Sequence, residues 1–165
     1  MKYITKANIC YYLASIILMV ILDLASKYLV FNYLTSTATR QVEILPIFNF
    51  VMVWNRGISF GMLNNIPNAP LVLTIIAFLI VLFLLRWLLT TESKYIAISL
   101  TFIISGAFGN IIDRVINGAV ADFLDFHIAG YHWPAFNLAD SFVTIGAILL
   151  IFEDLFFKIY KCYKK

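Results

Sequence analysis

Long apolar segments alternate with short polar ones along the whole chain. A bilayer core needs about 20 residues of helix, and four segments reach that length, at residues 8–31, 71–89, 95–116 and 139–157. The first segment is too long, and has the wrong flanks, for a cleaved signal peptide, so we interpret it as a retained helix. The pattern predicts a mainly α membrane protein with four transmembrane helices in a single domain, residues 1–165.

Two connections between these segments are much longer than the third. They cover residues 32–70 and 117–138. Within the first, QVEILPIFNFVMVW is rich in β-branched and aromatic residues with partial alternation, and a turn-like NRG follows it. This composition predicts short strands lying at the membrane surface, over about residues 40–62. Residues 117–138 are expected to form a second outer loop.

Composition and charge agree with a membrane protein and add its orientation. The chain is 62% hydrophobic and 13% charged, whereas about a quarter of the residues in soluble domains are charged. Its net charge of +3 does not indicate nucleic-acid binding, because the cations gather beside the apolar segments. Cytoplasmic loops carry an excess of Lys and Arg, which places both termini in the cytoplasm and the two long connections outside. The basic residues on the cytoplasmic side are Lys2, Lys6, Arg86, Lys94, Lys158, Lys161, Lys164 and Lys165.

The polar residues inside the apolar segments fall at one depth. Asp23 lies roughly 22 Å along a helix from Asn8, in the outer half of the first segment. Charges inside a bilayer are expensive and normally face the bundle interior or a wet cavity. The pattern therefore predicts a polar site at the outer membrane edge. The other residues at this depth are Asn110, Asp113 and Arg114 at the end of the third segment, Asp122 in the loop, and Asp140 at the start of the fourth.

Structural roles could also explain several of these residues. Asp23 and Lys27 have the i, i+4 spacing of a salt bridge on one helix. Asp140 could cap its own helix, and Asp122 could be a solvated loop residue, as we interpret Asp125. A chemical role remains open, because two neighbouring carboxylates share one proton. One of them is then a base that can activate water, and the other is an acid.

Four motifs carry a resemblance to a known family. DLASK (23–27), NRGISFG (55–61), GAFGNIIDRVINGAVADFLDF (106–126) and FNLADSFVTIG (136–146) resemble, in order, the motif series of the lipoprotein signal peptidases, signal peptidase II. Ser26 stands where that family often has Thr, and Ser59 where it often has Ala. The resemblance implies a bacterial inner-membrane aspartic endopeptidase with its site on the extracytoplasmic side. Such an enzyme removes signal peptides from prolipoproteins whose cysteine carries a diacylglyceryl group.

The same resemblance assigns roles to individual residues. It implies that Asp122 and Asp140 are the catalytic pair, and that residues 40–62 form an outer β-cradle that holds the substrate. It also implies inhibition by globomycin-type cyclic peptides. We expect no cofactor and no metal, and a monomer would suffice. The residues that it implies as substrate-binding or supporting are Asn55, Gly57, Asn110, Arg114, Asn137, Asp23 and Lys27.

Two other classes of protein compete with a protease. A proton-coupled transporter subunit could use the same acids as a relay, although transporters tend to place such groups near the midplane, beside broken helices or in repeated halves. A purely structural membrane protein could use them as salt bridges between helices. That alternative leaves Asn55, Asn110 and Asn137 without a role.

Overall fold

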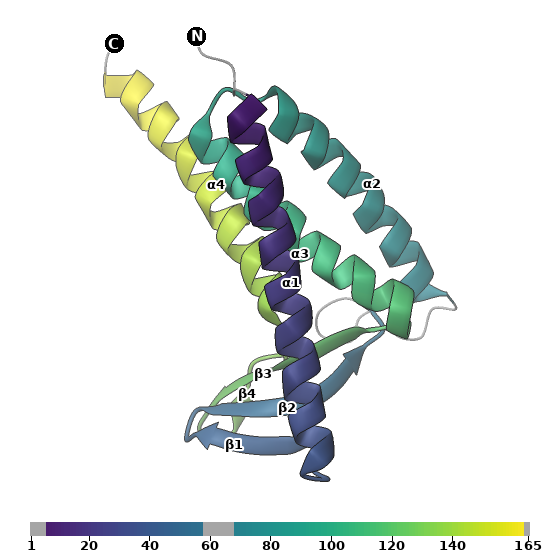
Figure 1. Ribbon diagram of the computed structural model, residues 1–165. Coiled ribbons are helices and arrows are strands. Elements are labelled where there is room, and N and C mark those ends of the chain that lie inside the picture. Colours follow the sequence, from purple (N-terminus) through teal and green to yellow (C-terminus); the bar gives the residue numbers. More distant parts are fainter. Residues whose placement is uncertain (1–5, 58–67, 164–165) are drawn as a thin grey trace.

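Four helices and a small sheet make up the described part of the chain (Figure 1). The computed structural model describes residues 6–57 and 68–163, with side chains in 8–57 and 68–153. The ends of the helical bundle differ: the start of α1 and the end of α4 lie together at one end, and the sheet lies at the other. In chain order the elements are α1 (Lys6–Ser36), β1 (Gln41–Leu45), β2 (Phe48–Asn55), α2 (Ala69–Thr90), α3 (Lys94–Asn117), β3 (Val120–Ile128), β4 (Tyr131–His132) and α4 (Leu138–Tyr163).

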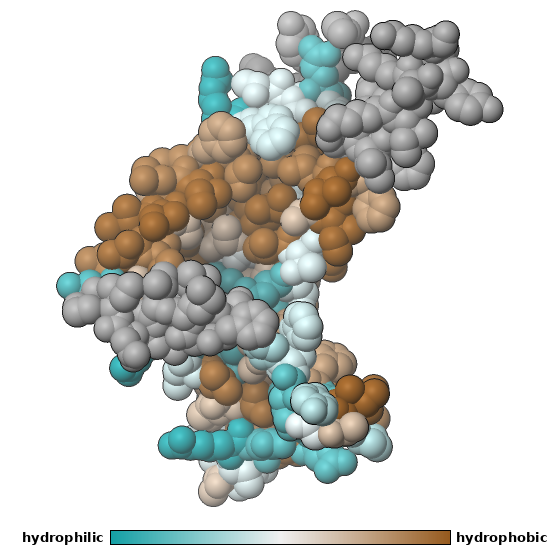
Figure 2. Space-filling view, turned by 180° about the vertical axis from the view of Figure 1, so that it is seen from behind, coloured by the Kyte–Doolittle hydropathy of each residue, from teal (hydrophilic) through white to brown (hydrophobic). Residues whose placement is uncertain are grey.

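Three of the described helices have the length and composition of membrane spans. They are the Asn8–Ser36 part of α1, α2 and α3. Helix α4 has 26 residues, and a fourth span there stays a prediction. Figure 2 shows a broad hydrophobic belt between two more polar ends, and large apolar side chains on α1 and α2, such as Ile17 and Phe83, are exposed. Because the belt is apolar, the hydrocarbon core of a bilayer, which is about 30 Å thick, would cover it.

Helix α3 is the centre of the bundle, because it packs against each of the other three helices. Ser93 caps its start by accepting a hydrogen bond from the N–H of Ile96, and Gly118 ends it in the left-handed conformation, with φ 67°. Small residues let the helices approach closely. A Cβ added to Gly109 would overlap the Asp23 carboxylate and press on the Ala139 side chain.

The sheet is antiparallel and has the strand order β1-β2-β3-β4. Strands β1 and β2 lie inside the region predicted to contain strands. Helix α1 continues beyond the bundle to the sheet, where Phe31 packs edge-on against Trp54 with ring centroids 5.0 Å apart and Leu34 is fully buried. The sheet is thereby fixed to the end of the bundle.

Strand β3 lies within residues 117–138, where a loop was expected. Its first four residues are all buried, so its sequence lacks the alternation of a half-exposed strand. The interpretation of Asp125 as a solvated loop residue is wrong. Asp125 is buried on β3, accepts a hydrogen bond from Asn49 Nδ2 at 2.8 Å, and lies 2.9 Å from His132 Nδ1.

Candidate active site

Carboxylates from two elements line one cavity where the bundle meets the sheet. The cavity has a volume of about 590 Å³ and opens between β3, the 133–136 segment and the outer ends of α3 and α4. Asp122 comes from the start of β3, and Asp140 from the first turn of α4. The polar residues of its lining are Asn55, Asn110, Arg114, Asp122, Asp140, Ser141 and Thr144.

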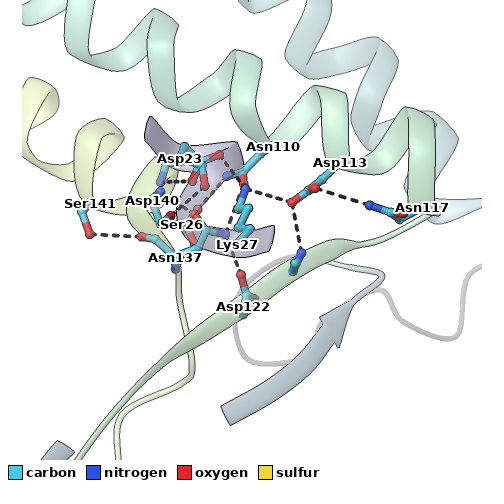
Figure 3. A network of polar contacts seen from close by, with 12 residues as sticks. Asp23, Ser26, Lys27, Asn110, Asp113, Asn117, Asp122, Asn137, Asp140 and Ser141 are labelled. Carbon is cyan, nitrogen blue, oxygen red and sulfur yellow. Dashed lines mark hydrogen bonds and ion pairs between the residues drawn. The ribbon is translucent and has the colours of Figure 1, made fainter. Parts of the chain in front are cut away.

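Asn137 links the two carboxylates (Figure 3). Its side-chain Nδ2 donates to Asp122 Oδ1 at 2.7 Å, and its backbone N–H donates to Asp140 Oδ2 at 3.3 Å. In return, the N–H of Asp140 donates to Asn137 Oδ1 at 2.9 Å. This reciprocal pair is a capping box at the start of α4. The capping role considered for Asp140 is therefore real, and it leaves Asp140 Oδ1 directed to another partner.

Two further asparagines complete the hydrogen bonding of the carboxylates. Asn110 Nδ2 donates to Asp140 Oδ1 at 2.7 Å, and Asn55 Nδ2 donates to Asp122 Oδ2 at 3.1 Å. All the side-chain donors that these bonds bring to the pair are neutral amides. Neutral amides can orient a carboxylate without neutralising it as a counter-ion would.

The environment of Asp122 favours its protonated form. Burial, followed by the negative charge of Asp140, raises the pKa of Asp122 to about 7, although the amides of Asn55 and Asn137 and the charge of Lys27 oppose the shift. A carboxylic acid with a pKa near the ambient pH can both donate and accept a proton. Two carboxylates arranged in this way can share one proton.

Among the described residues, Arg114 brings the one guanidinium of the cavity lining. Its Nη2 donates to the carbonyl oxygen of Gly57 at 3.2 Å, and its Nε is buried without a hydrogen-bond partner among the described residues. Gly57 in turn donates its N–H to Asn55 Oδ1 at 3.0 Å. The NRG segment is thus held between Arg114 and the asparagine that contacts Asp122.

Behind the cavity lies a buried ion cluster formed by Asp23, Lys27 and Asp113. Lys27 Nζ lies 2.8 Å from Asp23 Oδ2 and 2.9 Å from Asp113 Oδ2. The salt bridge considered for Asp23 and Lys27 is therefore confirmed, and it has a second anion on α3. Lys27 also donates to Asn110 Oδ1 at 3.2 Å, so the cluster touches the cavity lining.

Comparisons with known proteins agree over most of the chain. The family model of signal peptidase (SPase) II matches residues 15–156. The chain belongs to the signal peptidase II family. The lipoprotein signal peptidase of Alteromonas mediterranea is 42% identical over 136 residues, which cover 81% of this chain and 74% of that protein. That of Burkholderia thailandensis is 41% identical over 138 residues, 77% of this chain and 82% of that protein.

Solved structures give the same relationship in three dimensions. A bacterial membrane enzyme determined by the in meso method at 1.9 Å resolution superposes with a TM-score of 0.75 and 31% identity, covering 89% of this chain and 94% of that one. As a signal peptidase II, the protein is a bacterial integral membrane protease that removes signal peptides from lipoproteins. The family decides against the transporter and purely structural alternatives.

The fold gathers the residues suggested by the sequence at one place. The seven residues that the resemblance gave as supporting lie in the cavity lining or behind it. Asn55, Asn110 and Arg114 are in the lining, Gly57, Asn137 and Lys27 contact lining residues, and Asp23 lies behind Lys27. Their roles stay predictions. Asp113 was not singled out for a role, although it belongs to the buried ion cluster. Its spacing was a usable signal, since Asn110, Asp113 and Arg114 are at i, i+3 and i+4 and share a helix face.

Proposed function

We propose that Asp122 and Asp140 form a catalytic dyad that activates water to cut the signal peptide from a diacylglyceryl-modified prolipoprotein. The observation that carries this proposal is their joint presence in one cavity, linked through Asn137. The raised pKa of Asp122, about 7, supports a shared proton. No covalent acyl-enzyme is needed, because water itself is the nucleophile.

The surroundings of the two aspartates suggest different roles. Asp140 sits in the first turn of α4, where the helix dipole favours negative charge, so it is the base that takes a proton from water. Asp122 is the protonated partner that donates its proton to the scissile carbonyl oxygen. The resulting tetrahedral intermediate collapses when the amide nitrogen receives the proton held by Asp140 and one hydroxyl group of the intermediate returns its proton to Asp122. The peptide bond breaks, and one water molecule has been consumed.

Arg114 and the NRG segment are suited to hold the substrate backbone. The Nε of Arg114 has no partner among the described residues and can donate to a substrate carbonyl. Asn55 and Gly57 position that side of the cavity. The sheet beside the cavity would act as the β-cradle for the peptide around the cleavage site.

The position of the cavity suits a lipid-modified substrate. It lies at the end of the bundle that carries the sheet (Figure 1), which we place at the extracytoplasmic face with both termini in the cytoplasm. A cysteine that carries two acyl chains can reach this site while the chains stay in lipid. A monomer suffices because one chain supplies both carboxylates, and globomycin-type cyclic peptides are expected to occupy the same cavity.

The decisive experiment measures cleavage of a diacylglyceryl-modified prolipoprotein by the purified protein in detergent. Asp122→Asn and Asp140→Asn should each abolish cleavage while keeping their unfolding temperature, because each removes one proton-transfer group. Asp125→Asn is the matched control: it changes a buried carboxylate on the same strand as Asp122, and it should keep most of the activity.

Either of two results would overturn the assignment. Near wild-type cleavage by Asp122→Asn or Asp140→Asn would remove that residue from the chemistry. Complete loss in Asp125→Asn, with folding intact, would show that the wrong carboxylate on β3 had been chosen.

A further inference from the structure

The buried ion cluster has no part in the proposed chemistry, yet it is costly to maintain. Asp23, Lys27 and Asp113 are all buried, and Lys27 is only 4% exposed. Burying charges costs free energy, which close pairing only partly returns. Holding α1 against α3 would require no charges, since apolar packing can do so at least as well. Packing of α1 on α3 therefore does not explain why these three residues are charged.

Each anion of the cluster also holds a backbone N–H next to a dyad aspartate. Asp23 Oδ1 accepts from the N–H of Ala139 at 2.8 Å, and Asp113 Oδ2 accepts from the N–H of Ala121 at 3.2 Å. Ala139 immediately precedes Asp140, and Ala121 immediately precedes Asp122. Besides the link through Asn137, a second chain of contacts thus joins the two dyad residues through Asp113, Lys27 and Asp23.

Lys27 also fixes the orientation of Asn110. The side-chain oxygen of Asn110 accepts from Lys27 Nζ at 3.2 Å and from Asn137 Nδ2 at 3.2 Å, and its Nδ2 donates to Asp140. An ammonium group can only donate. A flipped Asn110 amide would direct its NH₂ at Lys27 and its oxygen at the Asp140 carboxylate, so the cation selects the orientation that serves Asp140.

We propose that Lys27 is a positioning residue that sets the separation and orientation of Asp122 and Asp140 by holding Asp23 and Asp113 on one ammonium group. This inference rests on the proposed function. Without the cation, the two anions of the cluster repel each other and move apart. Asp23 then displaces the start of α4, and Asp113 displaces the start of β3. Asn110 also loses the contact with Lys27 that orients its amide.

The test compares variants that separate charge from geometry. Lys27→Met keeps an unbranched side chain without the charge, and Lys27→Arg keeps the charge with a larger head group. Lys94→Met is the control, since Lys94 is an exposed cation at the start of α3. Cleavage of the diacylglyceryl-modified prolipoprotein gives kcat, KM and a pH profile, and thermal unfolding is recorded for each variant.

Lys27→Met should lower kcat about a hundred-fold, as expected for a displacement of reacting groups by about 1 Å, while KM stays close to the wild-type value. Its alkaline limb should also move to higher pH, because the charge of Lys27 lowers the pKa of Asp122. Lys27→Arg should lower kcat but leave that limb in place. A purely structural role predicts a lower unfolding temperature with the same kcat and pH profile in the folded fraction.

Lys27→Met leaves two buried anions unpaired and can fail to fold. The double variant Lys27→Met/Asp113→Asn leaves Asp23 as the one charged residue of the cluster. Asp23 lies on α1 and contacts the start of α4 through the N–H of Ala139, and the variant is measured in the same way. A wild-type kcat and pH profile in either folded variant would overturn the role of Lys27. Failure of the wild type to cleave, or activity in Asp122→Asn, would instead overturn the proposed function on which this inference rests.

Discussion

At the scale of single residues, asparagines decide how the two aspartates behave. Asn55, Asn110 and Asn137 donate neutral amide hydrogen bonds to them, and the cationic Lys27 is kept one residue further away, behind Asn110. A directly paired cation would lower the pKa of a carboxyl group and keep it ionised. Neutral donors instead leave burial as the largest effect, and the pKa of Asp122 rises to about 7.

This environment predicts a particular pH dependence. The charged groups around Asp122 are Asp140 on α4, Arg114 on α3 and Lys27 on α1. Because Asp122 must be protonated to act as the acid, cleavage should fall as the pH rises through about 7. Because the pair of carboxylates must lose one of its two protons to provide the base, cleavage should also fall in acid, which gives a bell-shaped profile. A rate that stays level from neutral to alkaline pH would contradict a protonated Asp122.

The stability of the fold should also depend on the protonation of Asp122. The pKa of Asp122 is raised in the folded state from 3.8 to about 7, so the folded state binds this proton more tightly than the unfolded state does. The stabilisation from this group is complete below about pH 4 and is lost as the pH rises through about 7. The unfolding temperature of Asp122→Asn should therefore fall less than that of the wild type over this range, and equal slopes would count against the shift.

At the scale of elements, periodicity and motifs predicted much of the architecture but not the long-range pairing. The apolar segments indicated helices where α1, α2 and α3 are found, and the FNLAD motif placed Asn137 and Asp140 at a helix start. The region around Asp125, expected as a loop, is a strand. The partners of Asp125 are Asn49 on β2 and His132 on β4, and spacing along the sequence does not reveal such long-range pairing. Likewise, i, i+4 spacing identified Asp23 with Lys27, whereas Asp113 joins them only through the packing of α1 on α3.

Both α1 and α4 approach α3 closely at Gly109. Gly109 leaves space for the Asp23 carboxylate and for Ala139, so Gly109→Ala should displace both the ion cluster and the start of α4. We expect a loss of stability of about 1–3 kcal/mol, which is typical of overpacking, and a fall in kcat. Thermal unfolding and cleavage kinetics test this, with Ile98→Ala on the exposed face of α3 as the control. Unchanged kinetics would show that the added methyl group is accommodated without displacing Asp140.

At the scale of the whole molecule, the charge distribution predicts the orientation in the membrane. Tyr131 is exposed at the sheet end, and Lys94 is exposed at the start of α3. With Cys10 and Cys162 replaced by Ser, Tyr131→Cys should react with a membrane-impermeant maleimide in intact spheroplasts. Lys94→Cys should react only after the membrane is permeabilised. The reverse labelling pattern would place the cavity in the cytoplasm.

The order in which the site is assembled has a consequence for biogenesis. The ribosome makes α1, α3 and β3 first, whereas Asn137 and Asp140 belong to the start of the last helix. With Asp122 and Asp140 as the proposed dyad, a nascent chain should have no hydrolytic capacity until α4 joins the bundle, and it should not cleave neighbouring polypeptides during its own insertion. An insertion intermediate without α4 also lacks the Ala139 N–H from which Asp23 accepts a hydrogen bond. The arrival of α4 should thus complete the proposed site and the hydrogen bonding of Asp23 in the same step.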